Sequence, residues 1–335
     1  MKIRIAINGF GRIGRNLFRL LINHPSIEVV AINDLADNKT MSHLLKYDSV
    51  HGKLNDAISF DDNHLIFNQS KIAFLHEKDI SKINWQPYAI DFVIESTGKF
   101  KTKPQLQHHI NNGAKRVILS VPPEDNEIKT VVLGVNESIL DGSETIVSNA
   151  SCTTNNAAPM IKIIKELCGL DKAFITTVHS YTTDQSLHDQ SHKDLRRARG
   201  AAQSIIPTTT GAAKALTKIF PEYEGKIGGG GIRVPVPDGS LTDITCYVDR
   251  DITEKEINEA FKKASENGLR GILEYTEDPI VSIDVLGNTH SCLFDAQLTV
   301  VLGRMVKVVG WYDNEIGYSS RLIDLILYLS KAQDN

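Results

Sequence analysis

The chain has 335 residues, of which 41% are hydrophobic and 23% charged, and its formal net charge is −4. This composition is typical of a globular protein, and the length indicates about two domains. The mildly acidic balance argues against a general nucleic-acid or acidic-membrane partner. The four cysteines lack paired spacing, so we expect neither a disulfide framework nor a bound metal. No apolar run approaches the ~20 residues of a membrane span. The chain starts directly with a strand pattern, so we expect no signal peptide and a reducing, cytoplasmic location.

The first half opens with a glycine-rich turn between a strand and a helix. The apolar run Ile3–Ile7 predicts a buried strand, and apolar residues at helical spacing follow over 17–22. In the G-x-G-x-x-G pattern between them, Gly9 allows a tight turn, Gly11 lets backbone approach a pyrophosphate, and Gly14 lets helix and strand pack closely. The helix N-terminus then faces the phosphates. This pattern predicts a dinucleotide-binding half.

An acidic residue follows the second predicted strand, Val29–Ile32. Asp34 lies about 20 residues beyond the glycine pattern, where a carboxylate binds ribose hydroxyls. The alternative is a turn or helix-capping role, which aspartate often has at strand ends. A carboxylate here would repel a 2′-phosphate, so the sequence favours NAD over NADP.

Further strand patterns continue the βα alternation at 91–96, 116–119 and 130–133. Thr97 and Ser120 come directly after the first two of these strands. Ligands of open parallel sheets bind at the carboxyl ends of strands, so both residues are expected near the cofactor. A purely structural loop role remains open for each.

A cysteine stands at the centre of the polar stretch Ser148–Asn156, between a short apolar strand and a helix pattern. Cys152 therefore lies at the positive end of a helix dipole, a position that favours the thiolate. The alternative is a buried cysteine acting as a small hydrophobe. Its hydroxyl and amide neighbours instead favour a catalytic nucleophile. The other cysteines lie in apolar contexts and are expected in the core: Cys168, Cys246 and Cys292.

A histidine ends the predicted strand 173–179 and precedes a polar loop. A nucleophilic thiol needs a base, so we expect His179 to be the partner of Cys152, although a histidine at a strand end is often structural. The loop Ser180–Gln203 is long for a connection and contains four basic residues. They form either a solvated face or an anion site: Lys193, Arg196, Arg197 and Arg199.

Two further features favour bound anions. Pro207–Lys214 reads as a helix start with hydroxyls and glycine, whose free N–H groups make an anion site. Arg233 stands in the apolar strand Ile232–Pro237, where an arginine needs a carboxylate or a phosphate partner.

The remaining sequence predicts an α+β domain. Strand patterns at 241–249, 298–302 and 305–311 are interrupted by one clear helix at 253–267, which indicates a mixed or antiparallel sheet. A last helix from 316 is expected to return to the first domain and to bring Asn314 toward the cofactor. The fold class expected is therefore an α/β Rossmann domain, 1–150 completed by 316–335, and a catalytic α+β domain, 151–315.

With these motifs together, the chain closely resembles phosphorylating (type I) glyceraldehyde-3-phosphate dehydrogenases from end to end. The cysteine motif is highly specific for that family. The matching segments are Ile7–Arg15, Ser148–Asn155, His192–Arg199, Ile205–Ala215 and Trp311–Glu315.

The resemblance implies NAD-dependent oxidation of glyceraldehyde 3-phosphate to 1,3-bisphosphoglycerate through a Cys152 thioester, with inorganic phosphate as co-substrate. It implies a homotetramer whose arginine-rich loop lies near a neighbouring subunit's cofactor. The implied NAD contacts are Arg12, Ile13, Asp34, the Lys78 backbone, Ser120 and Asn314. The implied residues for the substrate and phosphate are Ser151, Thr153, Thr182, Arg197, Thr210, Gly211 and Arg233.

The chain departs from the family pattern at several positions. Asn156 replaces a usual second cysteine, Ile316 a usual tryptophan, and Asp238-Gly239-Ser240 the commoner Asn-Val-Ser. Gln190-Ser191 replaces a Leu-Pro common in NAD-specific bacterial members, which leaves the use of NADP open.

Three other functions are compatible with parts of the sequence. Erythrose-4-phosphate dehydrogenase is the nearest, a sister of the same fold. A Cys-His acyltransferase or hydrolase would produce no nicotinamide absorbance change on addition of an aldehyde. A non-catalytic NAD-binding regulator would need none of Cys152, His179 and Arg233.

Overall fold

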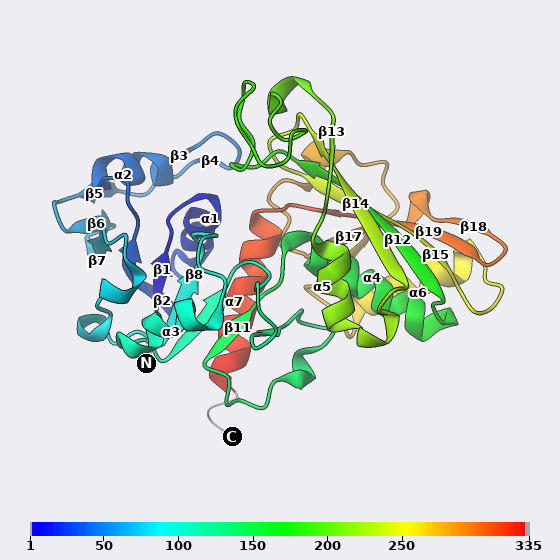
Figure 1. Cartoon of the computed structure of the whole chain (residues 1–335), viewed down its shortest axis with the longest axis horizontal. Coiled ribbons are helices and arrows are strands. Elements are labelled where there is room, and N and C mark those ends of the chain that lie inside the picture. Colours follow the sequence, from blue (N-terminus) through cyan, green and yellow to red (C-terminus); the bar gives the residue numbers. More distant parts are fainter. Residues whose placement is uncertain (1, 332–335) are drawn as a thin grey trace. The chain divides into compact units, whose positions relative to one another are not determined.

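The computed structural model describes residues 2–331, which divide into two compact units (Figure 1). The first comprises the residues up to Val131, Ser138–Ala150 and those from Ser319 on. The second comprises Val132–Glu137 and Ser151–Tyr318. Part of the expected C-terminal segment, 332–335, lies outside the described residues.

The first unit contains a nine-stranded sheet in the order β10-β11-β9-β8-β1-β2-β7-β6-β5. The pairs from β10 to β7 are parallel, and β6 and β5 extend that edge antiparallel. The strands are β1 (Ile3–Asn8), β2 (Ile27–Asn33), β5 (Ile58–Phe60), β6 (His64–Phe67), β7 (Ser70–Leu75), β8 (Phe92–Glu95), β9 (Arg116–Leu119), β10 (Lys129–Thr130) and β11 (Ile146–Ser148).

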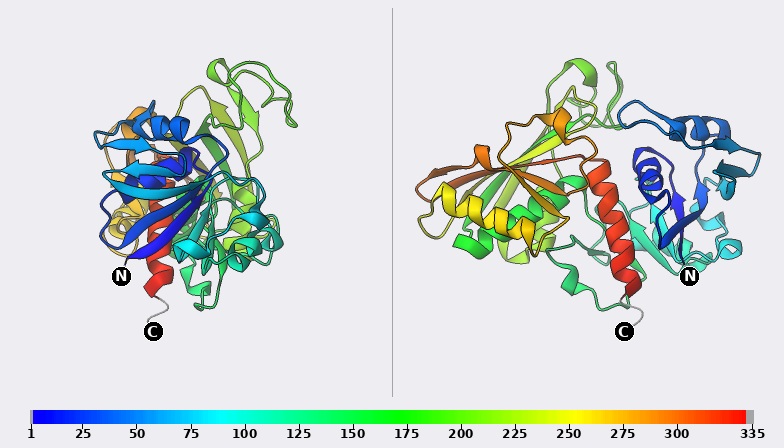
Figure 2. Two further views of the ribbon diagram at one scale, coloured as in Figure 1. Left: turned by 90° about the vertical axis from the view of Figure 1, so that its left-hand side faces the viewer. Right: turned by 180° about the vertical axis from the view of Figure 1, so that it is seen from behind.

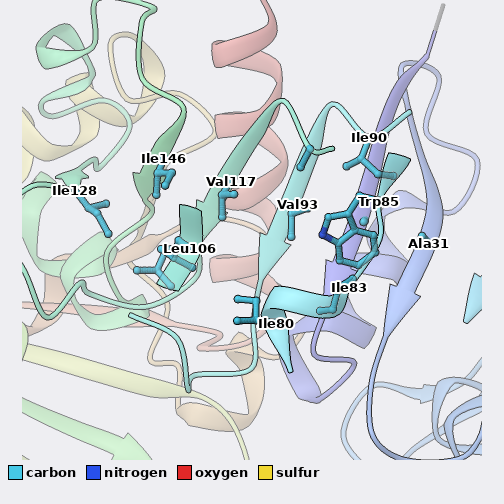
Figure 3. Close-up of a cluster of buried hydrophobic side chains, with 13 residues drawn as sticks. Ala31, Ile80, Ile83, Trp85, Ile90, Val93, Leu106, Val117, Ile128 and Ile146 are labelled. Carbon is cyan, nitrogen blue, oxygen red and sulfur yellow. The ribbon is translucent and has the colours of Figure 1, made fainter. Parts of the chain in front are cut away.

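Three helices and a small hairpin accompany this sheet: α1 (Arg12–Leu21), α2 (Asn38–Lys46), α3 (Lys103–Asn111), and the hairpin β3 (Tyr47–Asp48) with β4 (Gly52–Lys53). Figure 3 shows an apolar cluster in this unit, where Val93 of β8, Val117 of β9 and Ile146 of β11 meet Trp85 and Leu106. All residues of β8 and β9 are buried, as expected for parallel strands covered on both faces.

The second unit contains a mixed eight-stranded sheet in the order β13-β14-β12-β15-β19-β17-β16, with β18 paired to β19. The pairs β12–β14 and β16–β17 are parallel, and the others are antiparallel. The strands are β12 (Lys172–Ser180), β13 (Ile206–Thr208), β14 (Ile227–Val234), β15 (Ser240–Tyr247), β16 (Leu273–Thr276), β17 (Cys292–Asp295), β18 (Val300–Leu302) and β19 (Met305–Tyr312).

Helices α4 (Cys152–Cys168), α5 (Ala212–Ile219) and α6 (Glu254–Glu266) pack on this sheet (Figure 2). α4 contacts both other helices and strands β15, β17 and β19. α6 begins at a capping box, in which the hydroxyl of Thr253 accepts from Glu256 N and the Glu256 carboxylate accepts from Thr253 N. The predicted fold class, a Rossmann-type domain with an α+β domain, is confirmed.

The last helix, α7 (Ile316–Lys331), starts in the second unit and belongs to the first from Ser319 on. Within the first unit, Arg116 Nη1 donates to Leu329 O at 2.6 Å. Among residues 2–331, the structure contains no helix long and apolar enough to cross a membrane.

Several strands differ from the prediction. β14 begins at Ile227 and includes four consecutive glycines, which hide a strand from a propensity argument. A Cβ on Gly229 would lie 2.8 Å from the carbonyl oxygen of Ile175, so the glycines allow β14 and β12 to approach closely. β10 is shorter than the predicted 130–133, and β13, β16 and β17 were not predicted.

Candidate active site

The glycine turn after β1 is shaped by close backbone packing. A Cβ on Gly14 would lie 2.3 Å from the carbonyl oxygen of Gly9, and a Cβ on Gly9, whose φ is +96°, would lie 2.7 Å from Thr97 N. Gly11 is exposed, and nothing lies within 4 Å of an added Cβ. It is also the N-cap of α1 and offers no side chain to the first-turn N–H groups. The turn therefore fits a pyrophosphate that approaches the backbone at Gly11.

Asp34 is anchored beside this turn. Its Oδ2 accepts from Phe10 N at 2.7 Å and its Oδ1 from Ala36 N at 3.0 Å, so the half-buried carboxylate is fixed at the end of β2. Asp34 can therefore stabilise the turn and still present its half-buried carboxylate to a ribose.

The other residues expected to bind NAD in this unit also follow parallel strands. Arg12 and Ile13 form the first turn of α1, where the Arg12 guanidinium pairs with Asp48. Lys78 is exposed three residues beyond β7, and Ser120 is buried directly after β9. All therefore lie at the carboxyl ends of strands β1, β7 and β9.

Cys152 begins α4 in the second unit. The preceding residue, Ser151, is the N-cap, and its Oγ accepts from Thr154 N at 3.2 Å. Ala150 has a φ of +55°, an uncommon left-handed conformation for a residue with a Cβ. Such strained positions cluster at functional sites. The Cys152 side chain is partly exposed, whereas Cys168, Cys246 and Cys292 are buried as predicted.

His179 lies opposite Cys152. Its Nε2 is 3.5 Å from Cys152 Sγ. His179 on β12 is in register with Arg233 on β14, whose Nη1 lies 2.6 Å from His179 Nδ1 and donates to Ser180 O at 2.8 Å. Nδ1 also lies 2.8 Å from Ser180 O. One tautomer therefore donates from Nδ1 to Ser180 O and turns an Nε2 lone pair to the sulfur. The other accepts from Arg233 and turns Nε2–H to the sulfur.

Burial and nearby charge set the electrostatics of this pair. Burial, and then the charge of Arg233, lower the pKa of His179 to about 3, so the imidazole is neutral at pH 7. Burial raises the pKa of the Cys152 thiol, and the guanidinium of Arg233 only partly opposes this. The hydrogen bonds at the start of the helix and the Arg233 guanidinium favour the thiolate, as expected from the sequence, whereas desolvation opposes it. A neutral imidazole therefore faces the sulfur at 3.5 Å.

Tyr312 is a site residue that sequence reasoning missed. Its hydroxyl lies 2.9 Å from Thr153 Oγ1, and its ring meets the His179 ring edge-on at 5.9 Å. Burial raises the pKa of this hydroxyl, which is therefore protonated. Tyr312 fixes both the imidazole and the Thr153 hydroxyl beside Cys152. Its neighbour Asp313 begins the turn into α7, and nothing in the local pattern marks the tyrosine.

The Arg197 side chain is tied down within the long loop. Its Nε donates to Thr208 Oγ1 at 2.9 Å and its Nη1 to Asp184 Oδ2 at 2.7 Å. Burial lowers the pKa of both His179 and Arg233, and the positive charge of Arg197 lowers both further. Arg197 and Arg233 form a basic cluster beside His179, in which Asp184 and Asp194 pair with Arg197. An anion is the ligand that such a cluster attracts.

The remaining predicted anion ligands lie near helix starts or strand ends. Gly211 is the N-cap of α5, and Thr210 Oγ1 accepts from Ala212 N at 3.2 Å. Thr182 is half-buried two residues beyond β12. Within the described chain, no hydrogen bond joins these three residues to Cys152 or His179.

Asn314 is held by two serines that the sequence did not indicate. Its Oδ1 accepts from Ser180 Oγ at 2.9 Å and from Ser240 Oγ at 2.7 Å. The amide oxygen is thereby occupied, which leaves the NH₂ group to donate. Because Ser180 also contacts His179 and Arg233 through its carbonyl, Asn314 and His179 share one support.

Residues 3–103 match the model of the glyceraldehyde 3-phosphate dehydrogenase NAD binding domain, and residues 151–314 match the C-terminal domain of the same family. This chain belongs to the glyceraldehyde-3-phosphate dehydrogenase family. It is 50% identical over 329 residues to glyceraldehyde-3-phosphate dehydrogenase 1 of Bacillus cereus, with 98% of each chain covered. It is 49% identical over 333 residues to glyceraldehyde-3-phosphate dehydrogenase 1 of Bacillus subtilis, with 99% of each covered. It is 49% identical over 332 residues to glyceraldehyde-3-phosphate dehydrogenase of Geobacillus stearothermophilus, with 98% of this chain and 99% of the relative covered.

Membership in this family confirms the predicted resemblance and the NAD cofactor.

The two departures from the family pattern at Asn156 and Ile316 both lie in buried positions. Asn156 Nδ2 donates to Ser291 O and to Trp311 O, at 3.3 and 3.2 Å, so the amide ties α4 to β19. An amide cannot form a disulfide, and Asn156 therefore removes thiol chemistry one turn from Cys152.

Proposed function

We propose that this chain oxidises D-glyceraldehyde 3-phosphate with NAD and inorganic phosphate to 1,3-bisphosphoglycerate, the phosphorylating step of glycolysis. The 3.5 Å approach of His179 Nε2 to Cys152 Sγ at the head of α4 carries this proposal, together with membership in the family. The enzyme class is that of an NAD-dependent oxidoreductase acting on an aldehyde group.

In the proposed reaction, Cys152 Sγ attacks the aldehyde carbon while His179 Nε2 accepts the thiol proton. The Cys152 N–H at the head of α4 stabilises the oxyanion, and the proton on His179 passes to it to give a thiohemiacetal, which leaves His179 neutral again. NAD supplies a hydride acceptor for the former aldehyde carbon. His179 takes the hydroxyl proton as this carbon becomes the acyl carbon of a thioester. Inorganic phosphate then attacks the thioester, and the proton on His179 returns to the departing sulfur.

The second unit provides two regions for anions. We assign the substrate's own phosphate to Arg233, Arg197 and Thr182, because two of them belong to the basic cluster around His179. We assign inorganic phosphate to the helix starts that carry hydroxyls and N–H groups: Ser151, Thr153, Thr210 and Gly211.

We assign NAD to the carboxyl edge of the first sheet and to Asn314. The Gly9–Gly11 turn, with Arg12 and Ile13, would receive the pyrophosphate, and Asp34 the ribose hydroxyls. The NH₂ group of Asn314 would hold the nicotinamide carboxamide, with Lys78 and Ser120 as further contacts. The Asp34 carboxylate favours NAD, while Gln190-Ser191 leaves some use of NADP as an alternative that initial rates with each nucleotide would measure.

We also propose that the first unit is the NAD domain and the second the catalytic domain, and that the protein is a cytoplasmic homotetramer. Three strongly exposed apolar side chains in and near the arginine-rich loop support self-association: Leu187 (63% exposed), Leu195 (81%) and Ile205 (71%).

Erythrose-4-phosphate dehydrogenase is the nearest alternative function. The relatives of this chain described above are all named for glyceraldehyde 3-phosphate, which favours that substrate. Turnover on the two aldehydes, measured side by side, distinguishes the two activities.

The substitution Cys152→Ser tests the covalent route. We expect NADH formation to disappear because the serine hydroxyl beside a neutral imidazole is a poor nucleophile, while NAD still binds. The measurement is NADH absorbance with glyceraldehyde 3-phosphate and phosphate, with calorimetry for NAD. Cys168→Ser is the matched control on the same helix: its hydroxyl can keep the bond to Ile164 O, so turnover should persist. Turnover in Cys152→Ser comparable to the parent would refute the thioester route.

A further inference from the structure

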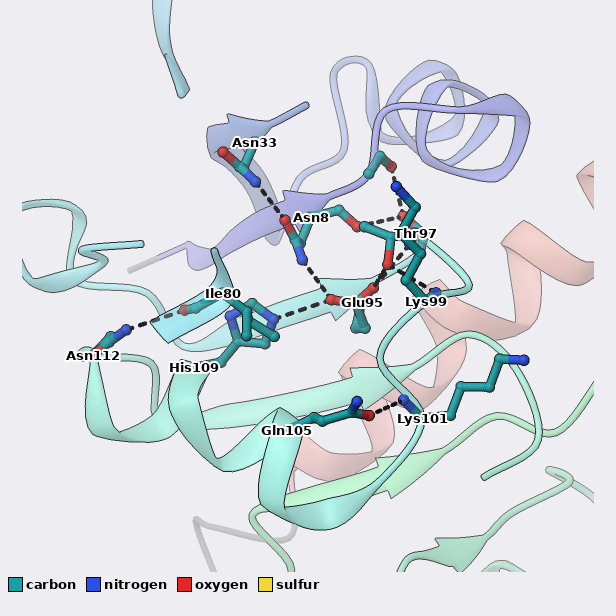
Figure 4. A network of polar contacts seen from close by, with 12 residues as sticks. Asn8, Asn33, Ile80, Glu95, Thr97, Lys99, Lys101, Gln105, His109 and Asn112 are labelled. Atoms are coloured by element: carbon teal, nitrogen blue, oxygen red, sulfur yellow. Dashed lines mark hydrogen bonds and ion pairs between the residues drawn. The ribbon is translucent and has the colours of Figure 1, made fainter. Parts of the chain in front are cut away.

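A buried carboxylate lies at the end of β8, in the middle of the first sheet. Glu95 has no exposed surface, and its Oε2 accepts from Asn8 Nδ2 at 2.5 Å and from His109 Nε2 at 3.1 Å. Its Oε1 accepts from Thr97 N at 2.9 Å and from the Thr97 hydroxyl. Figure 4 shows these side chains converging on Glu95 from β1, α3 and the loop after β8.

The indole of Trp85 fixes the direction of the hydrogen bonds that His109 makes in this network. Trp85 Nε1 can only donate, and it donates to His109 Nδ1 at 3.0 Å. His109 Nδ1 is therefore the lone-pair nitrogen, and Nε2 carries the hydrogen that is donated to Glu95. The two oxygens of Glu95 thus accept four hydrogen bonds. Both His109 and Trp85 have no exposed surface, so water does not compete for these bonds.

The network continues to the residues that precede the cofactor turns. Asn8 Oδ1 accepts from Asn33 Nδ2 at 2.8 Å, and Asn33 exchanges bonds with the backbone of Glu77. Asn8 directly precedes Gly9, Asn33 precedes Asp34, and Glu77 precedes Lys78. Thr97, the fourth branch, packs against Gly9 through its backbone. One carboxylate therefore joins the ends of β1, β2, β7 and β8.

We propose that Glu95, ordered by His109 and Trp85, is a positioning residue for NAD that fixes the strand-end turns receiving the dinucleotide. This inference rests on the proposed NAD site at the carboxyl edge of the first sheet. Glu95 touches no reacting atom in this proposal: it acts through Asn8, Asn33 and Thr97.

The first test is Glu95→Gln, which keeps the side-chain shape but turns an NH₂ group toward donors. We expect the dissociation constant for NAD to rise about tenfold or more, the effect of one buried mismatched hydrogen bond. The reaction of Cys152 with iodoacetamide in the absence of NAD should keep the parent rate, because Cys152 and its partners belong to the second unit. General loss of structure would change both measurements.

The second test compares two substitutions at His109. Gln places an amide N–H near the position of the imidazole Nε2 and can still donate to Glu95, whereas Leu cannot. We expect His109→Gln to retain NAD affinity within a few-fold of the parent and His109→Leu to weaken it about tenfold. This rescue by a donor distinguishes positioning by the hydrogen bond from simple packing of α3.

Gln105→Ala is the matched structural control. Gln105 Oε1 accepts from Lys101 N and Thr102 N and caps the helix that carries His109, without contacting Glu95. We expect lower thermal stability with unchanged NAD affinity. If the parent binds NAD and Glu95→Gln binds it equally well, the positioning role is overturned. Equal affinities of the two His109 variants, or weakening by Gln105→Ala equal to that of Glu95→Gln, would overturn it too. If the parent itself fails to bind NAD, the proposed function fails instead.

Discussion

Asp238 places a carboxyl group in a buried turn beside two other buried carboxyl groups, Asp313 and Glu315. Burial, followed by the charges of Asp313 and Glu315, raises the pKa of Asp238 to about 9. Its Oδ1 accepts from Gly239 N at 2.8 Å, one residue before Ser240, which holds Asn314. Asp238 is therefore a neutral acid at pH 7, at a position where the family commonly has an asparagine.

We predict that Asp238→Asn stabilises the protein, and increasingly so as the pH rises. The carboxyl ionises near pH 4 in the unfolded chain and near pH 9 in the folded one, so between these values the folded state binds more protons and stability falls with pH. Asparagine keeps the acceptor for Gly239 N and cannot ionise. The melting temperature of the variant should exceed that of the parent by more at pH 8 than at pH 5. The same difference at both values would contradict the assigned protonation.

The candidate site residues that the sequence indicated are those marked by their immediate neighbours. Cys152 stands in a polar stretch before a helix, and His179 ends a strand, and their reactive atoms lie 3.5 Å apart in the structure. Tyr312 and Ser240 escaped prediction because their partners, Thr153 and Asn314, are 159 and 74 residues away. The pKa direction of Cys152 also depends on burial by the whole second unit, which a local motif does not contain.

At the scale of elements, two glycines of the β1–α1 turn have different roles. Gly14 is needed because a Cβ would collide with Gly9 O at 2.3 Å, whereas Gly11 has open space around its Cβ position. Only Gly11 leaves room for a ligand against the backbone.

We therefore predict different outcomes for Gly14→Ala and Gly11→Ala. Gly14→Ala should lower stability by about 1–3 kcal/mol through overpacking and weaken NAD binding with it. Gly11→Ala should lower stability less, by about 0.5–1 kcal/mol for an alanine at a helix N-cap, yet raise the dissociation constant for NAD, because its methyl group occupies the pyrophosphate approach. Urea unfolding and NAD calorimetry on both variants provide the measurements. Unchanged NAD affinity in Gly11→Ala would remove the pyrophosphate from this turn.

Some strands could be predicted from the sequence, and others could not. Apolar runs such as Ile3–Ile7 and 116–119 were recognised because buried parallel strands are continuously apolar. The glycines of β14 carry no such signal, and at Gly229 the missing side chain lets β12 approach: a Cβ there would lie 2.8 Å from Ile175 O. A strand selected for close packing thus looks like a loop in sequence.

At the scale of the whole molecule, each unit holds one half of the proposed chemistry. The first contains the glycine turn, Asp34 and the Glu95 network, and the second contains Cys152, His179 and Arg233. NAD affinity and thiol reactivity can therefore be perturbed separately, which is the logic of the paired measurements above.

The long loop of the second unit carries an exposed side chain that self-association would bury. Leu195 is the most exposed large apolar side chain of the described chain, at 81%, and lies between Asp194 and Arg196. An exposed leucine within a charged loop gains little in a monomer, whereas burial against another subunit would stabilise an assembly by about 1.5–3 kcal/mol per side chain.

We predict that sedimentation gives the parent protein a mass of about four times the 37.1 kDa of one chain. We expect the Leu195→Glu variant to form smaller species. A carboxylate would have to be buried without a partner at each copy of the interface, which is costly. Ile139→Glu is the control: this side chain is 42% exposed but belongs to the first unit, outside the loop, so the tetramer should persist. Sedimentation velocity at several concentrations distinguishes the cases. A monomeric parent would remove the homotetramer. A tetrameric Leu195→Glu would place the subunit contacts away from this loop.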